Sequence, residues 1–558
     1  MSAIRTHLAV VASLGVLGCA RPAPVAPLPP LPREVYARYL EGKLAAYQTD
    51  WAAAADAVAL AAAAAPDQPM IWVELARLQM KAKRSAAAIA TLAAARGRWP
   101  DHPQVWLVSG ELLAARDPQL ASAAYLRAVQ LQPDDERAYL GLAKLQGDAA
   151  AEATLRILIA HVPTSIDGHY RLAVRLASRG ELASSTQELR AVLERDPDHI
   201  DARLDLARAL RRLGHLDQAI DETRSAFDRS GQALDLAEEL FWLLCEADDR
   251  AAALDLLTLL DDDRSDAEAL AVLARLDRGL GRLAEARAIA ARIAVIDRDA
   301  GAIALAEAEL AGGDHTAVAT ALAAIEPTSK LADDAHRLAA EAQLAAGAPS
   351  AALTEIAAIR PPGRSLDTAL LAAFALADLH RLADARALLA PFTTAGELGE
   401  RQAAQVAQAR LADRVGDAPA ALAILEPLLR AKPDLLIALN LAGYLLADTG
   451  QRLADAERYL RRARELAPGD PAILDSWGWL LLRRGEPRAA VRALDRAARG
   501  APLEPEILAH LAAAWAADRA PRTALTLLDQ ADALRPSPAV QRRIAAIRHS
   551  VAARLPGR

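Results

Sequence analysis

The stretch that decides the fold is residues 471–504, PAILDSWGWLLLRRGEPRAAVRALDRAARGAPLE. Counted from its first residue, positions 4, 7, 8 and 11 are apolar or small, and this spacing forms one stripe of a helix. Small residues at positions 8 and 20, Gly478 and Ala490, allow a second, antiparallel helix to approach the first closely. Pro502 at position 32 stops the second helix, because proline cannot continue it. The stretch therefore predicts a helical hairpin.

The same pattern recurs along most of the chain, with junction prolines about 34 residues apart. A hairpin of this length cannot bury its apolar face alone, so neighbouring units stack and each is expected to contact only its neighbours. Between 197 and 433 several junctions are acidic turns instead. The clearest junction prolines are Pro66, Pro100, Pro133, Pro163, Pro197, Pro433, Pro468, Pro502 and Pro536.

This pattern resembles the tetratricopeptide repeat family over about residues 34–536, most clearly in 69–133, 166–231 and 436–536. The resemblance implies an all-α fold, a right-handed α-solenoid of stacked antiparallel helix hairpins with about fifteen units. In the middle of the chain the helices are expected, but the unit boundaries are loose. The expected divisions are a signal peptide with lipobox at 1–19, a Pro-rich tether at 20–33, an N-terminal array at 34–231, degenerate repeats at 232–432, a C-terminal array at 433–536, and a capping helix and tail at 537–558.

The composition supports a helical, Ala- and Leu-built chain. Hydrophobic residues make up 53% of the 558 residues and aromatic residues only 4%. Charged residues at 25% are ordinary for a folded protein, which argues against disorder. The net charge of −7 argues against a general nucleic-acid binder. Two cysteines, one of them in the leader, exclude a disulfide framework.

The first residues resemble the leader of a bacterial lipoprotein. Arg5 precedes an apolar run at 8–17, which is too short to span a bilayer and is typical of a secretory signal. The tetrad VLGC at 16–19 resembles a lipobox, which implies that Cys19 carries lipid after cleavage. By the same resemblance, Ala20 after the cysteine favours the outer membrane of a Gram-negative bacterium, with the protein facing the periplasm. Ordinary secretory cleavage after Ala20 is the alternative.

Both ends of the repeat array carry segments of a different character. Residues 20–33, ARPAPVAPLPPLPR, are expected to be extended, because proline restricts the backbone, and to hold an anchored domain away from the bilayer. A disordered terminus fits the same composition. Residues 538–558 place Ile544, Ile547 and Val551 on one side of a helix, which suits a cap on the open end of the core. A basic helix that binds an anionic partner is the alternative.

No catalytic or cofactor motif is present in the sequence. It contains no GxGxxG or GxxxxGK[ST] phosphate loop, no HExxH zinc helix and no GxSxG elbow. The eleven histidines are scattered without metal-ligand spacing and are expected to be ordinary surface residues. We therefore expect no catalytic residue, no cofactor, no metal site and no small-molecule substrate.

Candidate binding residues come from the resemblance. In the tetratricopeptide family, positions 2, 5, 9, 12 and 13 of a unit face a concave groove that binds extended segments of partners. An aromatic side chain beside amide and carboxylate groups suits capture of a peptide, although the aromatic residues could instead pack against neighbouring helices. The Lys and Asn set of the family's carboxylate clamp is not reproduced, which disfavours an adaptor for chaperone tails. The groove candidates are Asn440, Tyr444, Asp448, Asp475, Trp479 and Arg483.

The leading functional hypothesis is a non-catalytic protein–protein interaction scaffold, anchored by lipid in the bacterial envelope. Its partners would be other envelope proteins or extended peptide segments of an assembly, secretion or polysaccharide-export machine, with no nucleic acid. Two alternatives remain open. One is an enzyme with a site hidden in the degenerate middle, 232–432, and the other is a glycan-binding solenoid that uses groove aromatics for stacking.

Overall fold

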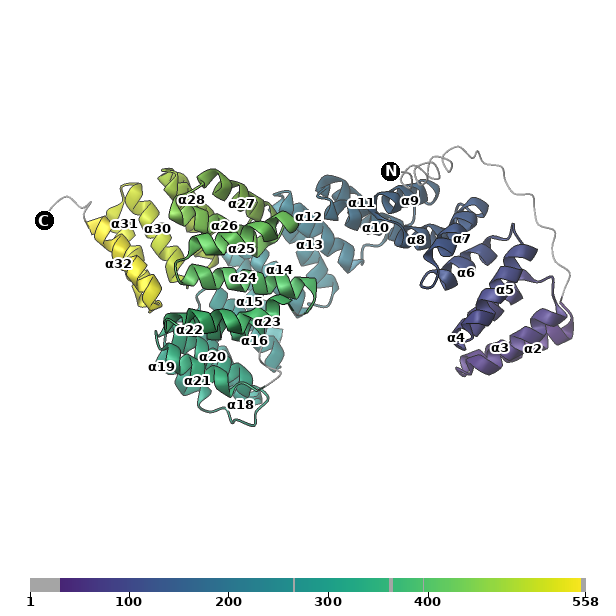
Figure 1. Cartoon of the computed structure of the whole chain (residues 1–558), viewed down its shortest axis with the longest axis horizontal. Coiled ribbons are helices and arrows are strands. Elements are labelled where there is room, and N and C mark those ends of the chain that lie inside the picture. Colours follow the sequence, from purple (N-terminus) through teal and green to yellow (C-terminus); the bar gives the residue numbers. More distant parts are fainter. Residues whose placement is uncertain (1–30, 264–265, 361–364, 395, 553–558) are drawn as a thin grey trace. The chain divides into compact units, whose positions relative to one another are not determined.

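The computed structural model describes residues 31–263, 266–360, 365–394 and 396–552 (Figure 1). Within these residues it contains 31 α-helices and no strand, which confirms the all-α class. Taken two at a time in chain order, α2–α31 correspond to the fifteen expected units, and α32 follows them. The fold is an α-solenoid. The chain divides into two compact units, unit 1 up to Leu213 and unit 2 from Gly214 to Arg558.

Unit 1 is built of short helices, each of which packs against the next. Its helices are α2 (Arg33–Tyr47), α3 (Trp51–Ala64), α4 (Pro69–Lys81), α5 (Ser85–Arg98), α6 (Pro103–Leu113), α7 (Pro118–Leu131), α8 (Glu136–Leu145), α9 (Asp148–His161), α10 (Ile166–Ser178), α11 (Leu182–Arg195) and α12 (Ile200–Arg212).

Unit 2 continues the same alternation and holds the candidate site. Its first helices are α13 (Leu216–Arg229), α14 (Leu234–Glu246), α15 (Arg250–Asp263), α16 (Ala267–Gly279), α17 (Leu283–Ile296), α18 (Arg298–Ala311), α19 (His315–Leu322), α20 (Ala332–Ala345), α21 (Pro349–Ala358), α22 (Leu366–Asp378) and α23 (Leu382–Thr394). They are followed by α24 (Leu398–Arg414), α25 (Ala418–Ala431), α26 (Leu436–Thr449), α27 (Leu453–Leu466), α28 (Pro471–Arg483), α29 (Pro487–Gly500), α30 (Pro505–Ala517), α31 (Pro521–Ala533) and α32 (Pro538–Ala552).

Local sequence determines where the helices begin and end. At the start of α28, the Asp470 side chain accepts hydrogen bonds from the backbone N–H groups of Ala472 and Ile473, and Pro471 occupies the first turn. These groups satisfy or remove N–H donors that have no partner inside the helix. The hairpin turn passes through Gly485 at φ +79°, a left-handed conformation that glycine adopts without strain. Pro502 follows the end of α29, as expected.

Small residues allow the two helices of a unit to pack closely. A methyl group on Gly478 would lie 2.5 Å from Cγ of Leu494, so only a residue without a side chain fits there. Ala490 and Ala497 on α29 are fully buried. The buried residues form a series of separate clusters along the array, because each hairpin buries its apolar face against its neighbours.

Unit 2 also contains contacts between repeats that are far apart in the sequence. An Nη2 atom of Arg496 lies 3.5 Å from the backbone oxygen of Glu246, across 250 residues. The guanidinium of Arg535 lies 3.1 Å from the carboxylate of Asp314, and a methyl group on Gly313 would overlap the backbone of Leu534. We expected each repeat to contact only the neighbouring repeats. This expectation is wrong for unit 2, because turns of its middle repeats meet turns of its C-terminal repeats.

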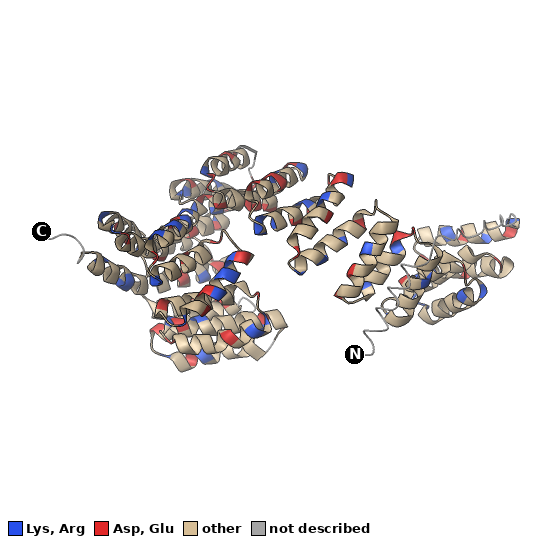
Figure 2. Ribbon diagram, turned by 90° about the horizontal axis from the view of Figure 1, so that it is seen from above, with Lys and Arg blue, Asp and Glu red and all other residues tan. Residues whose placement is uncertain are grey.

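Several sequence-based predictions lie outside the described residues. The lipobox, Cys19 and all but the last residues of the tether belong to residues 1–30. Among the described residues, none of the helices combines the length and the apolar character required to cross a bilayer. Lys and Arg are interspersed with Asp and Glu along the visible helices (Figure 2).

Candidate functional site

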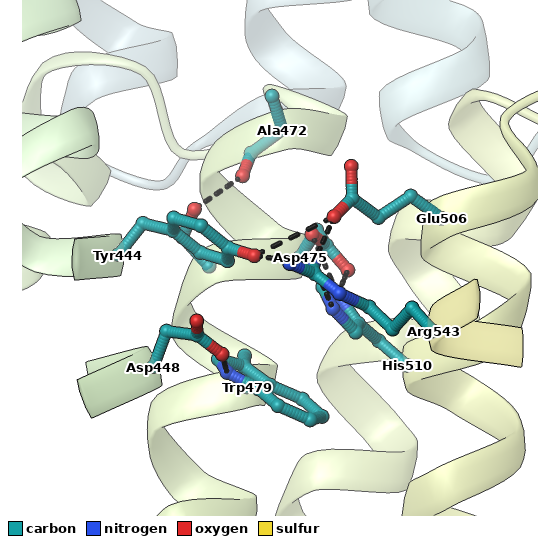
Figure 3. Close-up of polar contacts among 9 residues, drawn as sticks. Tyr444, Asp448, Ala472, Asp475, Trp479, Glu506, His510 and Arg543 are labelled. Atoms are coloured by element: carbon teal, nitrogen blue, oxygen red, sulfur yellow. Dashed lines mark hydrogen bonds and ion pairs between the residues drawn. The ribbon is translucent and has the colours of Figure 1, made fainter. Parts of the chain in front are cut away.

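The candidate site lies on the first helices of the C-terminal repeats. Helices α26, α28 and α30 pack side by side, and α32 packs against α30 and α31 at the end of the array. Their polar and aromatic side chains converge on one another (Figure 3). We call this cluster the groove network. Its members are Tyr444, Asp448, Asp475, Trp479, Glu506, His510 and Arg543.

A buried histidine–carboxylate pair lies at the centre of the groove network. His510 is completely buried, and its Nδ1 lies 2.9 Å and 3.1 Å from the two carboxylate oxygens of Asp475. Burial opposes the charging of the imidazole, but Asp475 outweighs this effect and raises the pKa of His510 above its usual value. The pair joins α28 to α30. Removal of either partner would leave a buried polar group without compensation.

Arg543 connects the last helix to two repeats. Its Nη1 donates to the hydroxyl of Tyr444 at 2.5 Å, forms an ion pair with Glu506, and lies 3.4 Å from Nε2 of His510. Burial lowers the pKa of this guanidinium, but Tyr444 and Glu506 more than offset it, so the pKa is raised. The side chains of Arg543 and Glu506 remain 34% and 40% exposed, so solvent reaches this ion pair.

An aromatic stack forms the other side of the groove network. The rings of Trp479 and His510 stack with centroids 4.2 Å apart and an interplanar angle of 24°. The indole N–H of Trp479 donates to Oδ1 of Asp448 at 3.0 Å, which ties α28 to α26. Tyr444 lies with its ring centroid 6.2 Å from that of His510, and burial raises its pKa well above the usual range. The aromatic rings therefore serve both packing and polar contacts.

The structure brings together four of the six residues that the sequence predicted for the groove. Tyr444, Asp448, Asp475 and Trp479 belong to the groove network. Asn440 is half-buried on the same helix as Tyr444, and its Oδ1 has no hydrogen-bond partner among the described residues. The exposed Arg483 lies beside Gly450, outside the network. No observation here tests whether any of the six binds a partner.

Sequence reasoning missed three members of the groove network. Glu506 occupies position 2 of its unit, one of the expected groove positions, and could have been found from the repeat register. His510 occupies position 6, outside that set, and Arg543 lies beyond the repeats, so no pattern pointed to them. The expectation that the histidines are ordinary surface residues is wrong for His510, and also for His169, which is 7% exposed and paired with Glu188.

The groove network provides hydrogen-bond acceptors, a guanidinium and aromatic faces, which suit non-covalent recognition. Within the described part of the chain, no cluster of three or more His, Cys, Asp and Glu side chains is arranged to hold a metal ion. A hollow of about 1100 Å³ lies along α17, α18 and α19, in the middle of the chain. Four of its charged groups form two pairs, Arg287 with Glu309 and Arg535 with Asp314.

Comparisons with known proteins identify the repeats. Two family models, both described as tetratricopeptide repeat, match this chain, one over residues 176–237 and the other over 39–103, 406–471 and 476–538. A TPR repeat-containing protein of Pseudomonas aeruginosa is 44% identical over 80 residues. That match covers 14% of this chain and 13% of the relative, so the chain spans about an eighth of the relative's length.

Solved structures with a similar arrangement were also found. The match to the crystal structure of the APC/C hetero-tetramer Cut9–Hcn1 covers 94% of this chain and 92% of the matched chain. The sequence identity is 15% and the TM-score is 0.40. The match to the crystal structure of YrrB, described as a TPR protein with an unusual peptide-binding site, covers 33% of this chain and 96% of the YrrB chain. The sequence identity is 16% and the TM-score is 0.28. The family models therefore identify tetratricopeptide repeats in this chain at residues 39–103, 176–237, 406–471 and 476–538.

Proposed function

We propose that this protein is a non-catalytic scaffold that binds extended segments of envelope proteins in the concave groove of its C-terminal repeats, 436–536. Tetratricopeptide repeat proteins are in general interaction scaffolds that bind peptides or other proteins. The observation that carries the proposal is the groove network, in which side chains of three successive repeats and α32 gather on the first helices. Such a preordered surface binds an extended chain without first having to be ordered itself.

The proposal includes a lipid anchor at Cys19 in the outer membrane of a Gram-negative bacterium, with the repeats in the periplasm. Its support is the sequence VLGC at 16–19 after a short apolar run, followed by a Pro-rich stretch. Labelled palmitate should enter the wild-type protein and should not enter Cys19→Ala. Equal labelling of the two proteins, or labelling of neither, would reject the anchor and leave the groove proposal standing.

The groove proposal is tested by capture of envelope proteins with matched tryptophan variants. Trp479 lies in the groove network, whereas Trp477, two residues earlier on the same helix, packs over Arg464 with the guanidinium 4.5 Å from the ring centroid. Trp479→Ala should weaken capture by about tenfold or more, as expected for loss of an aromatic anchor, and its melting curve separates this loss from unfolding of the repeats. Trp477→Ala should lower the melting temperature and leave capture by the folded protein unchanged. Equal capture by wild type and both variants would refute the groove assignment.

The hypothesis of an enzyme in the middle repeats gains no observation of its own. Four of the charged groups of the hollow along α17–α19 form ion pairs, Arg287 with Glu309 and Arg535 with Asp314. The glycan-binding hypothesis likewise gains no observation of its own.

A further inference from the structure

We infer that the groove network is a binding pocket for a guanidinium group. Arg543 of α32 fills this pocket in the free protein, and an arginine side chain of an extended partner segment takes its place. This inference rests on the proposed groove function and specifies the chemistry of the partner. The terminal helix then has two roles, as a cap on the solenoid and as an internal competitor for the groove.

The pocket is rich in negative charge. Asp475 is paired with His510, and Asp448 accepts from the indole of Trp479, so neither contacts Arg543 directly. A further carboxylate, Asp413 of α24, has its pKa raised by burial and by the nearby charge of Glu506. The arginines around Asp413 offset this rise only in part. Carboxylates that are poorly compensated favour binding of an additional or a better placed cation.

The hold of the pocket on Arg543 is incomplete. All three contacts of the guanidinium, with Tyr444, Glu506 and His510, are made through the single atom Nη1. A guanidinium reaches its strongest binding when two of its nitrogens bind one carboxylate in parallel. The ion pair with Glu506 is also partly exposed, so solvent and salt weaken it. An arginine that enters along the groove can adopt the bidentate geometry that Arg543 does not reach.

Helix α32 does not depend on Arg543 for its attachment. Ile544 and Val551 are each 1% exposed and pack into the terminal core cluster. Arg548 also forms ion pairs with Asp529 and Asp532 of α31, at 2.7 Å and 2.6 Å. These contacts keep the helix docked when the guanidinium of Arg543 leaves the pocket. Displacement therefore requires movement of one side chain, not unfolding of the cap.

The groove also provides the other groups that an arginine-bearing peptide needs. The stacked rings of Trp479 and His510 offer an aromatic face, on which guanidinium planes stack favourably. Asn440, one helical turn before Tyr444, has a buried Oδ1 with no hydrogen-bond partner among the described residues. A backbone N–H group or a guanidinium N–H group of a ligand would satisfy this acceptor. This acceptor therefore adds a hydrogen-bonding group beside the pocket.

The test compares two blocked peptides, acetyl-Gly-Gly-Arg-Gly-Gly-amide and its citrulline counterpart, which has the same shape without the charge. Isothermal titration calorimetry with the full chain measures both peptides on wild type, Arg543→Ala and Arg543→Gln. Arg542→Ala is the matched control, since Arg542 is exposed on the same helix. Removal of the internal competitor should tighten binding of the arginine peptide at least tenfold in both Arg543 variants and leave Arg542→Ala like wild type. Adding Glu506→Gln to Arg543→Ala should abolish the gain.

Three results would overturn the inference. They are equal affinity of wild type and both Arg543 variants for the arginine peptide, the absence of binding in all of them, and equal binding of the citrulline peptide. A thermal melt accompanies each titration, and Arg543→Gln, which keeps the first three side-chain carbons and a polar end, covers the case in which the alanine variant fails to fold. Binding of the arginine peptide without any loss of partner capture by Trp479→Ala would refute the groove as the site of partner capture and retain the pocket. Loss of partner capture by Trp479→Ala without binding of the arginine peptide would reject the pocket alone.

Discussion

The first helices of unit 1 and those of the C-terminal repeats use polar side chains in different ways. In unit 1, successive first helices are joined by separate pairs, such as Lys43–Glu74 at 2.6 Å and Arg77–Glu111 at 3.1 Å. Each of these pairs spans about one repeat and is at least partly open to solvent. In the C-terminal repeats the polar side chains converge from four helices around the buried His510.

The comparison indicates that one repeat scaffold can carry two kinds of polar surface. Separate exposed pairs contribute little each, because solvent screens them and both side chains must be held in place. A shared, partly buried network is sensitive to every member, because one lost partner leaves the others unsatisfied. The predictions below test this difference, beginning with the largest expected effect.

Asp475→Ala should destabilise the C-terminal repeats by about 3–5 kcal/mol, because it leaves the buried imidazole of His510 without its carboxylate. The effect should appear as a lower melting temperature and as faster hydrogen exchange in α28 and α30. Asp475→Asn, which keeps an acceptor oxygen at the site, should lower the free energy of unfolding by less. A loss under about 1 kcal/mol for the alanine variant would place this pair in the same class as the surface pairs of unit 1.

Gly313→Ala should lower the free energy of unfolding by about 2–4 kcal/mol. The residue has φ +72°, and the new methyl group would overlap the backbone of Leu534, so left-handed strain adds to overpacking. Gly180→Ala in unit 1 is the control, because Gly180 has φ +81° and open space around it. It should cost only about 1 kcal/mol. Equal costs, measured by chemical denaturation, would indicate that the contact between distant repeats of unit 2 contributes nothing.

Asp277→Asn should stabilise the protein by about 1–3 kcal/mol at pH 7. Asp277 is 3% exposed, its Oδ1 lies 3.3 Å from Nη1 of Arg282, and burial raises its pKa to about 6. In the unfolded chain an aspartate has a pKa of about 4, so the folded protein holds this proton more tightly. The stabilisation from the protonated acid is complete below about pH 4 and is lost as the pH rises through about 6.

Melting curves of the wild type and of Asp277→Asn between pH 4.5 and 7.5 measure this effect. The two proteins should be similar at the acid end and should diverge toward neutral pH. The variant thus separates a buried carboxylate that lacks adequate compensation from Asp475, whose carboxylate is bound by His510. A loss of stability at pH 7 on substitution of Asp277 would show that its contact with Arg282 outweighs the cost of burial.

Glu111→Ala should have the smallest effect, about 1 kcal/mol or less. The carboxylate pairs with Arg77, and the two side chains are 34% and 37% exposed. The difference from wild type should shrink further in 0.5 M salt, because added ions screen the pair. Thermal denaturation at two salt concentrations measures it. A cost comparable to that of Asp475→Ala would break the distinction between paired and convergent polar surfaces.

The sequence by itself determined the helices, their pairing and four members of the groove network. The spacing of apolar residues, the small residues Gly478 and Ala490, and the junction proline Pro502 act within a single hairpin, and each is visible in a 34-residue window. For the same reason, the repeat register placed Tyr444 and Trp479 on the face where the structure has them. Interactions within such a window are local, and local interactions leave a pattern in the sequence.

Only the tertiary structure decided which of these residues meet. The contacts of Arg543 with Tyr444 and of Arg535 with Asp314 join residues that are 99 residues apart or more. They depend on how the small rotation between neighbouring hairpins accumulates along unit 2. No short pattern encodes that sum, so the sequence did not indicate that Arg543 would join the groove network. Burial of His510 follows from the same geometry, because the helices that cover it belong to different repeats.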